Sequence, residues 1–484
     1  MANIRRDTLG RVSRKKKAMP WPAAPTTSDW VIDVAECLRG EGGVRDDEGA
    51  KFDLGKSWTI YRVPMNMKEV YRKAYVPRLV SVGPYHHGRR DLQVMEAHKM
   101  RYLLLALGGD AGSKEGSGVG DSLIRQRLEE MSSAVRELVD KARGCYSDAV
   151  EFGSNELVKM MVVDGCFVIQ LLRFYGKFSR DESIDDPIFS ARWMLRTLQR
   201  DLLMLENQLP FFVLEKLFEL TSSSAELSLV DLVLTFFDPL LPREGKIPKP
   251  NPKEQHRHML DVFRLTFLTL LKDRTDEKSS WTHLKSPNNV PLVRERQLIH
   301  CVSELQDSGI KLQKRGCSDL LEIEFEHNTL EIPPLNIDDN TVPLFLNFLA
   351  YEQCDEVAEP FFTNYFMFFD SLISSENDIE ILHKHGIVDH VMGNHRDAAR
   401  LINRLCREIV YDLDQCYLSR QMNEINVFCD KYYSHQWRLW WRNLIDQYFS
   451  SPWSFISLLA AIFLLLLQLG QTLYTIYPYY VPPK

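Results

Sequence analysis

The sequence predicts a mainly α protein with a multi-helix globular body, a small β-hairpin section and a C-terminal transmembrane helix. Three observations predict this fold class. Apolar residues recur at helical spacing through most of the chain, and one short segment alternates apolar and charged residues with a period of two. In addition, no charged side chain occurs between Gln447 and Pro483.

The composition is that of a folded globular chain from a reducing compartment. Of its 484 residues, 45% are hydrophobic and 26% are charged, which excludes collagen-like and wholly disordered chains. The 59 Lys and Arg residues against 66 Asp and Glu residues give a net charge of −7, which argues against a nucleic-acid partner. The 9 cysteines form no CxxC pair and do not suggest a disulfide scaffold. No apolar run of signal-peptide length follows the basic residues near the N-terminus, so the body is expected in the cytosol.

Breaks in the apolar periodicity delimit the body and its loops. Residues 1–50 mix basic residues, Pro and Gly without a helical or strand period, so they are expected to form a mobile N-terminal arm. The body is expected over 51–440. Within it, the Gly- and Ser-rich residues 108–121, the proline-rich residues 238–254 and the polar residues 272–291 are expected to be surface loops.

Helices are expected between these breaks. Residues 123–142 carry apolar side chains at a spacing typical of an amphipathic surface helix. Residues 160–172 are nearly all apolar but too short to cross a membrane, which predicts a buried helix. A further helix is expected over 192–209, and Pro210 forces a new helix to start after it. Residues 396–449 could form one long helix, whose apolar stripe needs a partner surface in this protein or in another chain.

One segment has the period of a strand. Leu321, Ile323 and Phe325 alternate with glutamates, and a second run, TLEI, follows after His327 and Asn328. The pattern predicts a β-hairpin at about 320–335.

The C-terminal span is expected over Trp453–Tyr477, followed by a short tail over 478–484. Such a helix measures about 37 Å at about 1.5 Å per residue, enough for a hydrocarbon core of about 30 Å. Cations precede the span and only Lys484 follows it, which predicts a single-pass membrane protein with its N-terminal body in the cytosol. The alternative is a buried core helix. The residues expected to anchor the chain in lipid are Trp453, Phe455, Leu458, Leu459, Ile462, Phe463, Leu464, Leu465, Leu466, Leu467, Tyr474 and Tyr477.

No cofactor motif is recognised, and neither a cofactor nor a metal is predicted. The loop Gly49–Ser57 resembles a phosphate-binding loop but has one residue too many between its glycines. Histidines at 383, 385, 390 and 395 lie close together in the sequence, but their spacing matches no standard ligand register.

Three residues are candidates for acid or base chemistry. Asp164 lies inside the apolar run, Glu206 stands at a helix junction, and His86 lies in an expected turn. Each also has a structural interpretation. An ion pair would neutralise Asp164, Glu206 would satisfy backbone groups freed around Pro210, and His86 would bond to nearby backbone. Because the structural interpretation is favoured for each, no catalytic residue is predicted.

Several motifs, in order along the chain, resemble the plant domain of unknown function 247, also called the UPF0481 family. They include IYRVP at 60–64, VSVGPYHHG at 80–88, VDGCF at 163–167 and LENQLPF at 205–211, and the likeness covers about residues 50–477. The residues that match these family motifs include Pro77, Gly83, Pro84, Tyr85, His86, Asp164, Glu206, Asn207, Gln208, Pro210 and Glu352.

The resemblance implies a plant-specific, mostly helical, membrane-associated protein with no established catalytic activity. In grasses, some members look like pollen-side determinants of self-incompatibility, which act by recognition. The leading hypothesis is therefore a membrane-anchored, non-enzymatic recognition or signalling protein that contacts a protein partner through its body and membrane lipid through its last helix. One alternative is a membrane-tethered enzyme with an acid/base site around Asp164, Glu206 and His86. Another is an oligomeric scaffold built by the helix over 396–449.

Overall fold

The computed structural model describes most of the chain after residue 57. The described residues are 58–108, 118–180, 182–222, 226–241, 248–250, 255–278, 299–316, 320–412, 416–433, 442 and 452–480. All of them belong to one unit, Trp58–Lys484. The arm predicted over 1–50 lies outside the described residues, as do residues 109–117, 242–247, 251–254 and 279–291 of the three predicted loops.

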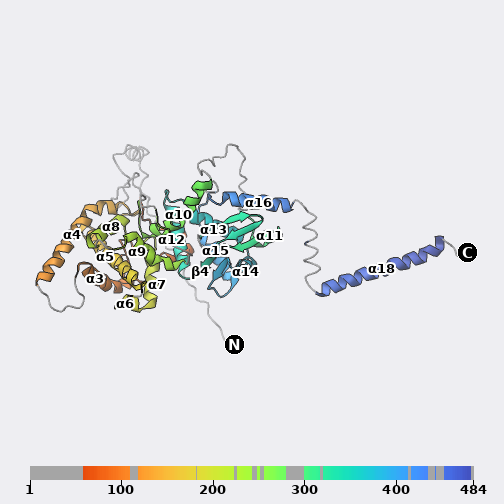
Figure 1. Ribbon diagram of the computed structural model, residues 1–484, viewed down its shortest axis with the longest axis horizontal. Coiled ribbons are helices and arrows are strands. Elements are labelled where there is room, and N and C mark those ends of the chain that lie inside the picture. Colours follow the sequence, from red (N-terminus) through yellow and green to blue (C-terminus); the bar gives the residue numbers. More distant parts are fainter. Residues whose placement is uncertain are drawn as a thin grey trace, which may run out of the picture. The chain divides into compact units, whose positions relative to one another are not determined.

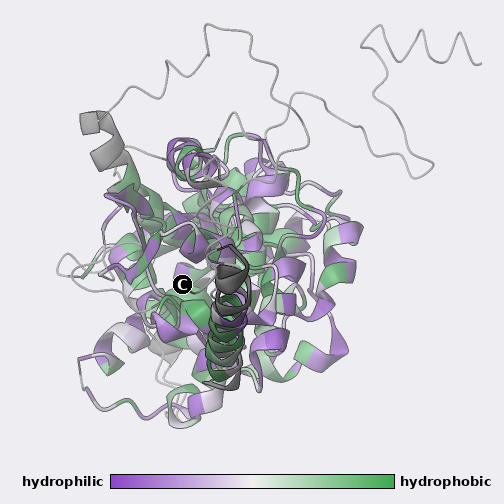
Figure 2. Ribbon diagram, turned by 90° about the vertical axis from the view of Figure 1, so that its right-hand side faces the viewer, coloured by the Kyte–Doolittle hydropathy of each residue, from purple (hydrophilic) through white to green (hydrophobic). Residues whose placement is uncertain are grey.

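The described chain is mainly helical, as predicted (Figure 1). Its first helices are α2 (Met65–Val70), α3 (Val94–Ala106), α4 (Gly118–Arg143), α5 (Ser154–Phe178), α6 (Pro187–Ser190), α7 (Arg192–Asp201), α8 (Phe211–Thr221) and α9 (Leu229–Phe237). Three short 3-10 turns accompany them: η1 (Arg72–Ala74), η2 (Arg90–Leu92) and η3 (Asp238–Leu240). The later helices are α10 (Met259–Lys278), α11 (Val302–Asp307), α12 (Thr341–Cys354), α13 (Phe361–Leu372), α14 (Glu376–Lys384), α15 (His395–Leu405), α16 (Ser419–Tyr433) and α18 (Pro452–Tyr480). Many of these helices carry both hydrophobic and hydrophilic residues, the pattern of amphipathic helices packed on a core (Figure 2).

Helix α5 lies at the centre of the first group of helices. It packs against α3, α4, α8 and α9, and this enclosure explains its apolar run. Gly165 allows α8 to approach closely, because a Cβ atom at this position would lie only 2.4 Å from Cδ1 of Leu217. The buried helix predicted over 160–172 is confirmed as the middle of α5.

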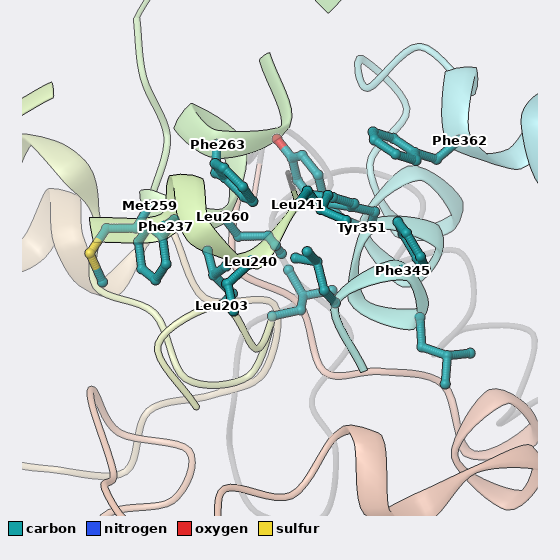
Figure 3. Packing of buried hydrophobic residues seen from close by; sticks show 14 of the residues in the cluster. Leu203, Phe237, Leu240, Leu241, Met259, Leu260, Phe263, Phe345, Tyr351 and Phe362 are labelled. Atoms are coloured by element: carbon teal, nitrogen blue, oxygen red, sulfur yellow. The ribbon is translucent and has the colours of Figure 1, made fainter. Parts of the chain in front are cut away.

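Aromatic side chains join the first group of helices to the later ones in a continuous core (Figure 3). The ring centroids of Phe237 on α9 and Phe263 on α10 lie 5.7 Å apart. Phe263 in turn lies 6.2 Å from Phe348 on α12, which stacks on Phe362 of α13 at 4.4 Å. Such rings bury large apolar areas, so α10 and α12 hold the two groups of helices together.

Two small sheets complete the body. In the first, β1 (Lys311–Lys314) pairs in parallel with β3 (Thr329–Ile332), and β2 (Glu324–Glu326) pairs antiparallel with the other edge of β3. The β2–β3 hairpin lies within the segment predicted from the period of two. Its turn residues His327 and Asn328 have φ of 50° and 63°, as tight hairpin turns require. In the second sheet, β4 (Leu335–Ile337) pairs in parallel with β5 (Val388–His390).

The single long helix predicted over 396–449 is wrong. Helix α15 ends at Leu405, the backbone of Glu408 turns into the left-handed region with φ of 61°, and α16 begins only at Ser419. The side chain of Gln353 holds the intervening chain by bonding both main-chain groups of Val410, at 2.7 and 3.1 Å. Leu405 is buried in the body's own core. Of the apolar stripe that suggested an oligomeric scaffold, Leu405 and Cys416 therefore pack inside this chain.

The transmembrane helix predicted over Trp453–Tyr477 is corrected by the structure. Helix α18 covers this segment, but its described side chains are those of residues 456–472, so the predicted anchors at both ends lie outside them. Gln468 and Gln471 place polar groups in this stretch. In the part of the chain that the structure describes, no helix combines the length and the apolar character of a membrane span. A single-pass anchor through the predicted residues is therefore not supported.

Candidate functional site

The candidate site centres on the segment 78–83, which belongs to no helix or strand. Buried side chains bind its main-chain groups. Asp201, the last residue of α7, accepts hydrogen bonds from the main-chain N–H groups of residues 78–80 at 2.9, 2.7 and 3.2 Å. Arg200 Nη1 pairs with the same carboxylate at 3.0 Å. Burial raises the pKa of Asp201 to about 6, although these amides and Arg200 oppose the rise. The carboxylate therefore remains ionised at neutral pH and fixes the start of the segment.

Asn207 and Gln208 extend this support. Asn207 Oδ1 accepts from the N–H of Val82 at 2.7 Å, and its Nδ2 donates to the carbonyl of Val80 at 3.1 Å. Gln208 Nε2 donates to two carbonyls of the turn at 202–204, at 2.7 and 2.8 Å. Both side chains are fully buried, so these bonds satisfy backbone groups that would otherwise lack partners.

Asp164 on α5 and Lys99 on α3 form a buried ion pair beneath the segment. Lys99 Nζ lies 2.7 Å from Asp164 Oδ1 and 2.7 Å from Glu96 Oε1, while Asp164 Oδ2 accepts from the N–H of Gly83 at 3.0 Å. Burial raises the pKa of Asp164, and Lys99 opposes that rise. For Lys99 itself, burial alone would lower the pKa, but the two carboxylates outweigh it and raise the pKa. The short contact between Lys99 and Asp164 joins α3 to α5.

A cavity of about 360 Å³ opens beside this ion pair. The carboxylates of Glu96, Glu156 and Asp164 and the ammonium group of Lys159 line it, together with Met100, Phe152, Met160, Val163 and His87. A small ligand would fit this volume, and the excess of carboxylates would favour a cationic group. All three carboxylates are already engaged, Glu156 with the N–H of Gly153 at 3.2 Å.

Glu206 holds the segment around Val63, which precedes residues 78–83 in the chain, in the same way. Its Oε1 accepts from the N–H of Val63 at 2.7 Å and lies 2.5 Å from Lys68 Nζ. Arg62 Nη1 lies 3.7 Å from Oε2, and His86 Nε2 lies 3.5 Å from it without a hydrogen bond. Burial, with Arg89, Arg62 and Lys68 nearby, lowers the pKa of His86 to about 3, so the imidazole is neutral.

The structure brings together two of the three residues weighed as an acid/base site. His86 and Glu206 are neighbours, whereas Asp164 lines a cavity to which neither of the other two contributes. Each carboxylate also has a lysine partner. The three side chains therefore do not converge on the cavity that Asp164 lines.

The remaining motif residues also have structural contacts. Glu352 of α12 is buried, and its carboxylate accepts from Arg264 Nε and Nη2 at 2.9 and 2.7 Å. It also accepts from the N–H groups of Phe362 and Thr363 at 3.0 and 2.7 Å and so caps the first turn of α13. Tyr85 accepts from the N–H of Asp148 at 3.1 Å, and its ring lies under the guanidinium of Arg62. Pro77, Pro84 and Pro210 are buried, and Pro210 precedes the first residue of α8.

Sequence reasoning missed three buried charges that complete these contacts. They are Lys99, Asp201 and Arg264. Arg264 lies inside the apolar run of α10, whereas Lys99 on α3 lies between the polar residues His98 and Arg101. The criterion that singled out Asp164, a charge within an apolar run, would therefore have found Arg264 but not Lys99.

The four clustered histidines divide into two kinds. The rings of His383, His390 and His395 lie within 5.1 to 5.8 Å of one another. His385 Nδ1 instead lies 2.8 Å from the carbonyl of Ile381 on its own helix. Among the described residues, no group of three or more His, Cys, Asp or Glu side chains is arranged to hold a metal ion.

Two buried neutral histidines predict that acid destabilises the protein. His258 Nε2 donates to the carbonyl of Thr59 at 2.9 Å and its Nδ1 accepts from the N–H of Asp261 at 3.1 Å, which requires a neutral ring. Burial lowers the pKa of His258 to about 4 and that of His86 to about 3. As the pH falls below 6.5, these two histidines become protonated in the unfolded chain before they do in the folded protein. Their contribution to the free energy of unfolding is therefore fully present above pH 6.5 and is lost as the pH falls. We expect each histidine to lower the free energy of unfolding by up to about 1.4 kcal/mol per pH unit between pH 6 and pH 4.5.

Denaturation with guanidinium chloride at several pH values checks this prediction. H258Q is expected to reduce the slope of the free energy of unfolding against pH by the contribution of one proton. The control is H87Q, which should keep the full slope because His87 is exposed. Equal slopes in H258Q and the parent chain would contradict the assignment.

Residues 60–467 of the chain match the sequence model of a family described as "Plant protein of unknown function", DUF247. The chain is 31% identical over 437 residues to UPF0481 protein At3g47200 of Arabidopsis thaliana, an alignment that covers 88% of this chain and 87% of the relative. It is 23% identical over 524 residues to Putative UPF0481 protein At3g02645 of the same plant, covering 90% and 93%. No solved structure matches the chain significantly.

Proposed function

The chain belongs to the plant family of unknown function DUF247, and from this premise we propose that it is a non-enzymatic protein that acts by binding another protein. One observation carries the proposal: four buried carboxylates each bind a cationic side chain and at least one main-chain N–H group. They are Asp164, Asp201, Glu206 and Glu352. Carboxylates whose oxygens are occupied by fixed donors hold the fold together and are not available to a substrate.

A surface on α7 offers a contact of the kind that protein interfaces use. Trp193 is 64% exposed, and Arg192 and Arg196 beside it are exposed as well. Tryptophan and arginine dominate the binding energy of protein interfaces, because they bury a large apolar area and carry specific donors. The cationic flanks favour a partner with acidic side chains at the contact.

The two relatives, both from Arabidopsis thaliana, give no support for a role in pollen recognition.

Quantitative affinity capture tests the proposal. The full chain and its W193A variant are immobilised and exposed to the same plant extract, and each retained protein is quantified. If Trp193 is an interface hot spot, W193A should bind its partner roughly 30-fold more weakly, which corresponds to about 2 kcal/mol. V94A is the matched control, since Val94 on α3 is 73% exposed and lies outside the α7 surface.

Two outcomes would count against the proposal. Equal retention of every protein by W193A and V94A would remove the α7 surface as the binding site. Consumption of a metabolite by the purified chain, lost in E206Q, would replace binding by the enzyme alternative.

A further inference from the structure

Three histidines from three consecutive elements meet at one corner of the body. His383 lies in the last turn of α14, His390 ends β5, and His395 is the first residue of α15. The ring centroids of His390 and His395 lie 5.1 Å apart, and that of His383 lies 5.8 and 5.5 Å from them. The three rings therefore form one cluster, which we call the histidine triad.

Hydrogen bonds of the histidine triad connect the three elements. His390 Nε2 and His395 Nδ1 lie 2.9 Å apart, so one nitrogen donates and the other must keep a lone pair. His383 Nδ1 donates to the carbonyl of Val388 at 3.1 Å and thus ties the end of α14 to the start of β5. The bond between the two rings exists only while at least one of them is neutral.

Few charges near the triad could neutralise several protons. On β5, Asp389 Oδ1 lies 3.9 Å from His383 Nδ1, and both groups are substantially exposed. On α14, Glu380 interacts with His395 but pairs with Lys384 at 2.7 Å.

The other charged groups on the packed elements have their own partners. Glu376 of α14 binds Arg396 of α15 at 2.9 Å, and Asp397 of α15 faces Arg400 at 3.6 Å. Strand β4 contributes no charged side chain. The acids of α13 and α11 interact elsewhere: Asp370 with Cys406, Glu304 with His300, and Asp307 with Arg442.

We propose that the histidine triad is an acid-sensitive lock, which holds β5 between α14 and α15 at neutral pH and releases this corner when more than one proton enters it. Two charged rings 5 to 6 Å apart repel each other, and protonation of both partners removes the bond between His390 and His395. A cation on His395 would also lie at the positive end of the α15 dipole. The three-residue β4–β5 ladder is the remaining main-chain pairing of β5.

The direction of the pH dependence follows from the same contacts. Burial, then the neighbouring His395 and His383, lowers the pKa of His390. Below pH 6.5 the opened corner therefore binds more protons than the closed one, so closure is complete above pH 6.5 and is lost as the pH falls.

Hydrogen exchange of the full chain, read out by mass spectrometry, tests the lock. Exchange is compared at pH 7.5 and pH 5.5, with labelling times corrected for intrinsic exchange rates and EDTA in both buffers. Peptides covering 386–399 are expected to lose protection at least 10-fold at pH 5.5, while peptides from α5 report global opening. H395N, which keeps a hydrogen-bonding side chain without a titrating ring, should abolish the difference. H385N is the matched control and should behave like the parent chain, because His385 lies outside the triad.

If residues 386–399 of H395N already exchange rapidly at pH 7.5, H390Q replaces H395N as the non-titrating variant. Unchanged protection of 386–399 in the parent chain at pH 5.5 would overturn the proposal. An equal loss in the parent chain and in the non-titrating variant would also overturn it.

Discussion

Replacement of Asp164 by asparagine is expected to lower the free energy of unfolding by about 3–5 kcal/mol, because it leaves the ammonium group of Lys99 buried without its main counter-charge. Lys99 is fully buried and Asp164 is 1% exposed, so water cannot take over the lost interaction. The remaining carboxylate near Lys99, that of Glu96, is 41% exposed and gives weaker compensation. The loss should appear as a lower midpoint of guanidinium denaturation followed by circular dichroism.

The matched control is E129Q on α4. Glu129 pairs with Arg125 at 3.2 Å, but both side chains are more than 70% exposed, so its loss should change stability by less than about 1 kcal/mol. A D164N midpoint as high as that of E129Q would show that the buried ion pair contributes little. Replacing both partners by apolar residues, as in K99M/D164L, should cost less than D164N alone, because no uncompensated charge then remains.

Gly83→Ala is expected to destabilise the protein to a similar extent, with a loss of about 2–5 kcal/mol in the free energy of unfolding. Gly83 has φ of +73°, where a side chain is strained, and a Cβ atom there would lie 2.6 Å from the main-chain oxygen of Gln208. That oxygen cannot move easily, because Tyr146 Oη donates to it at 3.1 Å. Alanine would therefore push the segment 78–83 away from the side chains that hold it.

Gly88→Ala separates the two contributions. Gly88 has a similar φ of +78°, but a Cβ atom there would meet nothing within 4 Å. We therefore expect G88A to lower the free energy of unfolding by about 1–2 kcal/mol, the cost of placing alanine at a positive φ. The additional loss in G83A then measures the collision with Gln208. Equal losses in G83A and G88A, measured by the same denaturation experiment, would argue against the close approach.

The sequence predicted individual helices better than it predicted where one helix ends and the next begins. The apolar run at 160–172 was sufficient to predict a buried helix, since its length and composition leave few alternatives. The break after α15 was not predictable in the same way. Neither proline nor glycine marks it, and Gln353, whose side chain binds Val410 after the turn at Glu408, is remote in the sequence.

In the candidate site, burial could be predicted from the sequence but the bonding partners could not. Burial of Asp164 and Glu206 followed from their apolar neighbours, but their roles depend on partners far away in the chain. Glu206 bonds the main chain of Val63, and Asp164 bonds Lys99 and Gly83. The histidine triad also depends on how α14, β5 and α15 pack, which no spacing in a single sequence reveals.

The side chains that hold the segment 78–83 make the early and middle parts of the chain depend on each other for folding. A product that stopped before residue 201 would lack the acceptors for residues 78–80 and 82, and Asn347 further ties Leu205 to Ala74 by bonds of 2.9 and 3.1 Å. Neither part can therefore reach its final conformation during synthesis until residues beyond 347 have emerged. A nascent chain must wait for most of its length before it becomes resistant to proteases, and shortened splice or cleavage products should be degraded.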